Sequence, residues 1–214
     1  EGDKLLPLLI ADNERYLRDL SFIQDARILV VDSDDNNVDL LILTKDVFSI
    51  GGRVSLSGSD RVRAEIREDN IHGTGNSFAI RGLFDNSRDP RYGYGAIYSR
   101  RNIKGTYLDW TTGFETFNTA FNTGRREEMT IYSRVDKPFV SRFAKWTGSL
   151  ELRYNQSNNA FRDTSFKNFQ RYINHNADVW GGLNLGYKRA RRSDAERRFR
   201  NFVAIRGFNR KFER

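Results

Sequence analysis

The sequence predicts a mainly β protein: an antiparallel transmembrane β-barrel, or part of one, preceded by a short helix–strand–strand module. Three observations support this fold class. Most of the chain alternates apolar with polar residues, the apolar rows are rich in Phe, Tyr, Trp and Gly, and the opposite rows carry Arg, Glu and Asp well inside the strands. In a transmembrane barrel, lipid contacts the apolar rows and a polar lumen holds the charges.

The first predicted hairpin flanks the segment 66–76, IREDNIHGTGN, whose glycines and asparagines interrupt the alternation. Residues 61–67 place apolar side chains between charged ones, and residues 77–84 place Phe and Ile between mostly polar ones. Further rows follow at residues 92–98, 108–114, 129–135, 148–154, 179–187 and 201–208. The last row has apolar residues on both faces. Regular spacing, with Gly, Asn, Asp and Pro between the rows, indicates a meander of about eight strands.

A soluble β-sheet is the alternative, and the mean hydropathy of −0.69 would suit one. A barrel gives a similar value, because only alternate residues of each strand meet lipid. No run reaches the roughly 18 apolar residues that a transmembrane helix needs. The absence of cysteine excludes disulfides and thiolate sites.

The net charge of +8 comes from 36 Lys and Arg against 28 Asp and Glu among 214 residues. Nucleic-acid binding is one explanation, and the arginine-rich stretches 189–192 and 197–200 favour it. The simpler explanation is a solvated turn, or a rim that meets anionic head groups, between two strands. We therefore expect no nucleic-acid partner.

Residues 1–47 are predicted to form a different module. Apolar residues recur at helical spacing over residues 5–20, where Asp12 or Asn13 is placed to cap the final turns. Residues 26–31 and 38–43 are β-rich, and the Asp and Asn residues between them favour a hairpin turn. Helix, strand, strand is the end of a small α+β module without its leading strand.

Several segments carry a resemblance to a known family. The stretch GDKLLPLLIADNERYLRDLSFIQDARILVVDSDDNNVDLLILTKD resembles the second half of a POTRA domain. The stretches VRAEIREDNIHGTGNSFAIRGLFDN and RNIKGTYLDWTTGFETF resemble the opening barrel strands of the BamA and bacterial surface antigen superfamily. A POTRA module followed at once by a barrel whose first turn reads DNxxGTG is specific to that superfamily, and the resemblance covers nearly the whole chain.

The resemblance implies a bacterial outer-membrane protein with periplasmic POTRA modules and a barrel of roughly sixteen strands. We therefore expect the C-terminal part of a POTRA-like module at residues 1–47, a linker at 48–60 and barrel strands at 61–214. Because fewer strands can be counted and no signal peptide is present, the chain is expected to be a fragment of a longer protein. A complete eight-stranded barrel, closed around packed side chains, is the alternative.

The resemblance also places the candidate sites. In such barrels the first strand pairs poorly with the last, which leaves a backbone edge that can template client strands. This edge would consist of Arg61, Val62, Arg63, Ala64, Glu65, Ile66 and Arg67. The first turn would consist of Asp69, Asn70, Gly73, Thr74 and Gly75. Arg206, Gly207 and Phe208 match a family motif of a lumenal loop. They fall in the last predicted strand, however, where an ordinary strand with an inward arginine is the alternative.

No catalytic, cofactor or metal site is expected. The chain has no G-x-S-x-G nucleophile elbow, and its two histidines, His72 and His175, lack metal-ligand spacing and are expected in loops. The glycine pairs 73/75 and 93/95 lack the third glycine of a dinucleotide loop. They are expected to serve turns and close packing.

The resemblance thus implies a protein that assists insertion or translocation of proteins at the outer membrane by strand templating. Outer-membrane lipids, unfolded or extended client chains and periplasmic or lipoprotein accessory subunits would be its partners. One alternative is a related transport or structural barrel without insertase activity. A more distant one is a soluble basic β-protein that binds nucleic acid.

Overall fold

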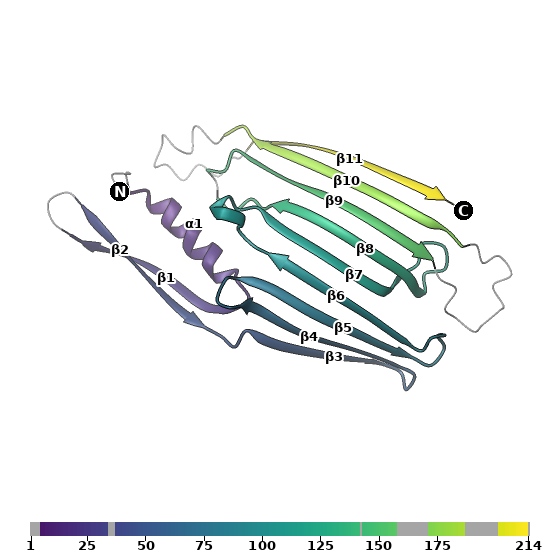
Figure 1. Cartoon of the computed structure of the whole chain (residues 1–214). Helices are drawn as coiled ribbons and strands as arrows, with labels where there is room; N and C mark the ends of the chain where they lie inside the picture. Colours follow the sequence, from purple (N-terminus) through teal and green to yellow (C-terminus); the bar gives the residue numbers. More distant parts are fainter. Residues whose placement is uncertain (1–4, 34–36, 142, 158–170, 187–200, 214) are drawn as a thin grey trace. The chain divides into compact units, whose positions relative to one another are not determined.

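A computed structural model of the chain describes residues 5–33, 37–141, 143–157, 171–186 and 201–213. The chain divides into two compact units. The first contains helix α1 and the hairpin β1–β2, and the second contains most of a large sheet, β3 to β11 (Figure 1). None of the described helices is long and apolar enough to cross a membrane.

The first unit contains the predicted helix and two strands, as α1 (Pro7–Arg18), β1 (Ile23–Asp32) and β2 (Val38–Asp46). Proline is favoured at the start of α1. An N–H group at this position would have no partner within the helix, and proline has no N–H to leave unpaired. The helix begins after Leu6 without a side-chain cap, and Asp12 lies in its middle. The prediction that Asp12 or Asn13 caps the final turns is therefore wrong.

The hairpin β1–β2 carries apolar side chains on both of its faces. Helix α1 packs against β1, where Ala26 is buried and the Glu14 carboxylate accepts a hydrogen bond from the Ile28 N–H at 3.1 Å. Many apolar side chains of the hairpin nevertheless remain exposed: Leu29, Val30, Val31, Leu40, Leu41, Ile42 and Leu43. Helix and hairpin therefore bury little of this apolar surface against each other.

The second unit is built on an antiparallel meander in which each strand pairs with its neighbours in sequence. The strands are β3 (Ile50–Ser57), β4 (Arg61–Ile71), β5 (Asn76–Asp85), β6 (Tyr92–Arg100), β7 (Asp109–Thr119), β8 (Arg126–Lys137), β9 (Trp146–Ser157), β10 (Ile173–Asn184) and β11 (Phe202–Glu213). A short 3₁₀ turn, η1 (Ile103–Gly105), lies between β6 and β7. β3 and β11 are the two edges of the sheet, and no described residue joins them.

The eight predicted rows correspond to β4 through β11, but the segment 48–60 is not a linker. It contains β3, which pairs with β4 from Ile50↔Glu68 to Ser57↔Arg61. The prediction failed because Gly51 and Gly52 resemble a turn signal, whereas here they occupy strand positions.

The apolar face of the sheet is exposed and the polar face contains buried side chains, which is the opposite of a soluble sheet. The register places one apolar row across the strands, and its members are exposed: Ile50, Val54, Leu56, Ile66, Phe78, Ile80, Tyr92, Tyr94, Ile131, Leu150 and Leu152. The opposite face buries polar side chains: Asp85, Glu128, Thr130, Asn155 and Ser157. Soluble sheets bury the apolar face, so this sheet is inverted.

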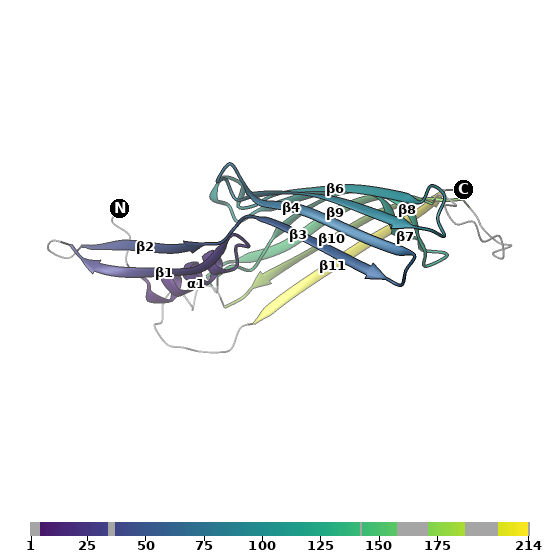
Figure 2. The same cartoon turned by 90° about the horizontal axis from the view of Figure 1, so that it is seen from below.

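Glycine on the polar face lets neighbouring strands approach closely. A Cβ on Gly95 would lie 2.8 Å from the Phe114 carbonyl oxygen and 3.2 Å from the Glu115 Cα, both in the adjoining strand β7. Bends and close backbone approaches in sheets are commonly made at such positions. Figure 2 shows the large sheet twisting, so that the strands at its two edges cross in projection.

Three predicted features lie wholly or partly outside the described residues. The arginine-rich stretches 189–192 and 197–200 lie wholly outside, as do residue 187 of the row 179–187 and residues 34–36 of the predicted hairpin turn.

Candidate functional site

The predicted edge, residues 61–67, is not at the edge of the sheet. It forms the first part of β4, which pairs with β3 on one side and with β5 on the other. Arg63, for example, lies between Ser55 of β3 and Leu83 of β5. Both backbone edges of this segment are therefore occupied, and the sequence-based assignment was one strand too late.

The free backbone edge lies on β3 instead. Within the part of the chain that the structure describes, β3 has β4 as its single neighbour, so its other side presents unpaired N–H and C=O groups. Its apolar side chains are exposed: Val54 by 69% and Leu56 by 71%. Such an edge is a template for a further strand.

β3 also lacks the features that normally prevent edge-to-edge pairing. Edge strands are commonly protected by charged side chains, proline or bulges. β3 contains one charge, Arg53, no proline, and an unbroken register with β4. The opposite edge differs, because β11 carries Arg206, Arg210, Lys211 and Glu213 along its length.

The predicted first turn lies between β4 and β5, and it is the second turn of the sheet because the β3–β4 turn precedes it. Gly73 and Gly75 both have positive φ, near 70°, which favours glycine. The Asn70 side-chain oxygen accepts a hydrogen bond from the Gly75 N–H at 2.8 Å, and the Thr74 hydroxyl donates to the Ile71 carbonyl at 2.6 Å. An ion pair of 3.2 Å joins Asp69 to Arg67. The motif thus closes a hairpin through its own side chains.

The Arg206–Gly207–Phe208 segment lies inside strand β11 rather than in a loop. Arg206 forms an ion pair with Asp178 of the neighbouring strand β10, and its Nε donates to Oδ1 at 2.9 Å. This placement agrees with the alternative, an ordinary strand with an inward arginine, because Arg206 lies beside Arg134 and Glu151 of the polar face.

Cross-strand ion pairs hold the polar face together. Arg61 donates to Asp85 at 2.7 Å and Arg81 donates to Glu65 at 2.7 Å, each pair joining β4 to β5. Opposite charges that face each other across a ladder stabilise the pairing and fix its register.

A buried hydrogen-bond network lies beside the turn between β7 and β8. The Tyr172 hydroxyl donates to the Glu128 carboxylate at 2.6 Å and accepts the Phe121 N–H at 2.8 Å. Burial and the adjacent carboxylate both disfavour the phenolate, and they raise the pKa of Tyr172 to about 12. This network fixes the segment before β10 to the β7–β8 turn.

The two histidines occupy different settings. His72 lies in the turn after β4 with φ of 52°, as predicted. His175 was predicted in a loop but lies in β10, where its ring packs edge-on against Tyr154 at 5.3 Å. No cluster of three His, Asp or Glu residues suited to a metal is found among the described residues.

Comparison with known proteins gives a structural likeness. No family model matches the chain, and no curated protein matches it. The chain is similar to the crystal structure of BamA from Haemophilus ducreyi lacking POTRA domains 1–3, with a TM-score of 0.44 and 16% sequence identity. The match covers 97% of this chain and 43% of that one. This chain therefore spans less than half of that structure.

Proposed function

We propose that this chain is part of an outer-membrane β-barrel protein that assists insertion or translocation of other proteins by templating their strands at the free edge of β3. The observation that carries the proposal is that edge, which is unprotected and belongs to a sheet whose apolar face is exposed. Residues 1–47 would be the periplasmic end of a POTRA module. Periplasmic or lipoprotein accessory subunits would be further partners.

Strand length and aromatic placement support a membrane location. β4 to β11 contain 9 to 12 residues each, close to the length that a tilted strand needs to cross a bilayer. On the apolar face, aromatic side chains gather toward both strand ends: Phe84, Tyr92 and Tyr94 at one end, and Phe78, Tyr98 and Trp110 at the other. Transmembrane barrels carry such aromatic girdles at the two interfaces.

Templating would follow from backbone geometry. An extended client segment would complete the hydrogen bonds that β3 leaves open, which is the principle of β-augmentation. Because side chains alternate with a period of two, only registers that differ by an even number of residues would align the client's apolar residues with Ile50, Val54 and Leu56. The lipid-facing row would then extend across the new strand without interruption.

Disulfide trapping in the cysteine-free chain tests this proposal. A cysteine replaces Ser55 on β3, and a client barrel carries single cysteines along its terminal strand. We expect a crosslink during assembly that recurs at every second client position. The matched control replaces Ala79 of β5, which lies on the same face but is paired on both sides. It should trap no client.

Two results would count against strand templating. Equal trapping at positions 55 and 79 would mean that contact with the client is not specific to the edge. Trapping confined to loops would favour the passive transport or structural barrel.

A further inference from the structure

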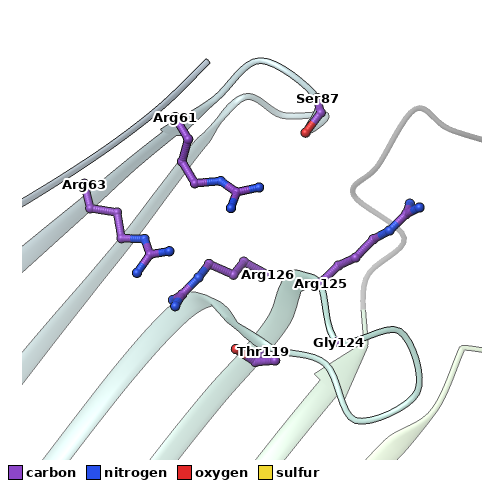
Figure 3. A pocket seen from close by; sticks show the side chains of 7 residues that line it. All are labelled: Arg61, Arg63, Ser87, Thr119, Gly124, Arg125 and Arg126. Atoms are coloured by element: carbon purple, nitrogen blue, oxygen red, sulfur yellow. The ribbon is translucent and has the colours of Figure 1, made fainter. Parts of the chain in front are cut away.

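The polar face of the large sheet carries an arginine-lined pocket that the templating role does not use. Four arginines, Arg61, Arg63, Arg125 and Arg126, line it together with Ser87, Thr119 and Gly124, and its volume is about 570 Å³. Figure 3 shows the guanidinium groups of Arg61, Arg63 and Arg126 turned toward a common space, while Arg125 points away. Pockets of this size suit small-molecule ligands.

The pocket has more positive than negative charge. Arg61 uses its Nε to bind Asp85. Arg126 is attracted by Glu115 but repelled by Arg61 and Arg63. Among the described residues, Arg63 and Arg126 form no ion pair. Arg61 has a carboxylate within ion-pair distance, whereas Arg63 and Arg126 do not, and an anion between these two would offset the repulsion between their positive charges.

The fold brings these arginines together from distant parts of the chain. Arg61 and Arg63 belong to β4, and Arg126 begins β8 with three strands between them. All three line one pocket on the polar face, at the same end of their strands. Gly93 and Gly95 of the intervening strand β6 present no side chain to this face. The space between the arginines is therefore not filled from β6.

We propose that this pocket binds an anion with two or more phosphate groups. A guanidinium presents a planar fork of donors that matches two phosphate oxygens, and converging forks from two strands would hold adjacent phosphates. The pocket opens on the polar face, away from the apolar row that would meet lipid. A soluble polyphosphate is therefore favoured over a lipid head group. The inference does not depend on templating, since a passive barrel would carry the same pocket.

Calorimetric titration of the full chain in non-ionic detergent, with inorganic pyrophosphate as the probe, tests the proposal. We expect saturable binding that weakens as salt is raised. Arg63→Gln and Arg126→Gln should each weaken it about tenfold or more, since each removes charge-assisted hydrogen bonds, and Arg126→Lys should weaken it less. Arg134→Gln is the control, because it removes the same charge from the same face of β8 but lies outside the pocket.

A second measurement needs no variant. Phenylglyoxal modifies accessible arginines, and pyrophosphate should protect Arg63 and Arg126 but not Arg134. Mixed micelles that contain a diphosphorylated lipid form the second arm. Protection there comparable to that by pyrophosphate would assign the site to a head group, and protection by pyrophosphate alone would assign it to a soluble anion. Absence of saturable binding, or equal losses in Arg134→Gln and the pocket variants, would overturn the proposal.

Discussion

Ile80 and Ala79 are adjacent residues of β5 whose side chains lie on opposite faces of the sheet. Ile80 belongs to the exposed apolar row near the middle of its strand. If this row meets lipid, Ile80→Arg should lower the free energy of unfolding in a bilayer by about 2–4 kcal/mol. Ala79→Arg, on the polar face, should cost much less. Denaturant titrations in lipid vesicles measure both, and equal costs would contradict the assignment of the faces.

Tyr172 should make the stability of the fold depend on pH. Its folded-state pKa of about 12 lies above the ordinary tyrosine value of about 10, so the folded state holds the proton more tightly. The protonated Tyr172 hydroxyl therefore contributes its full stabilisation of the folded state below a pH of about 10, and this contribution is lost as the pH rises through about 12. Tyr172→Phe should cost about 1.5–3 kcal/mol near neutral pH, because it removes a buried hydrogen bond to a carboxylate.

Unfolding titrations of the parent and Tyr172→Phe at several pH values check this prediction. The difference between the two proteins should shrink as pH rises through this range. Glu128 also accepts the Phe121 N–H at 3.2 Å, so the network is weakened rather than abolished in the variant. A difference that stays constant with pH would show that the phenol proton does not contribute.

Single-residue roles were predictable from the sequence only where they depend on local chemistry. The first turn was found because Gly73, Gly75 and Asn70 act within a few residues of one another. The arginine pocket was not, because Arg63 and Arg126 are far apart in the sequence and three strands lie between theirs in the sheet. The prediction that His175 lies in a loop was wrong because a polar residue near the end of a strand is easily assigned to the adjoining turn.

Among the elements, β6 and β7 depend on a glycine contact. Gly95→Ala would place a Cβ 2.8 Å from the Phe114 carbonyl oxygen, and backbone cannot move as a side-chain tip can. We expect a loss of about 1–3 kcal/mol from this overpacking. Gly82→Ala is the matched control in the neighbouring strand, because its Cβ would meet nothing within 4 Å. Urea unfolding of both variants measures the difference, and equal losses would contradict the close approach.

Eight of the nine sheet strands were predicted because aromatic and aliphatic residues mark their alternation. β3 also alternates, with Ile50, Val54 and Leu56 on one face. Its alternation is interrupted at Gly51 and Gly52, which carry no side chain. Periodicity detects side chains and not backbone pairing. The edge of the sheet, which depends on pairing, was therefore placed one strand too late.

At the scale of the whole molecule, the exposed apolar row predicts a requirement for detergent. Soluble proteins rarely expose a contiguous apolar surface larger than several hundred Å². The row on this sheet crosses most of its strands. Dilution below the critical micelle concentration should therefore cause aggregation, detectable by light scattering and size-exclusion chromatography. A monodisperse protein without detergent would instead indicate a soluble sheet with a covered face.

The unprotected β3 edge also has a consequence for biosynthesis. On the proposed membrane role, the same backbone would, before insertion, pair with any extended segment it met, including β3 of another copy. The longer the chain remains uninserted, the more fibrillar material should form by pairing of β3 edges. A carrier that shields hydrophobic strands until insertion would compete with this loss, so the yield of folded protein should be set by the relative rates of escort and self-association.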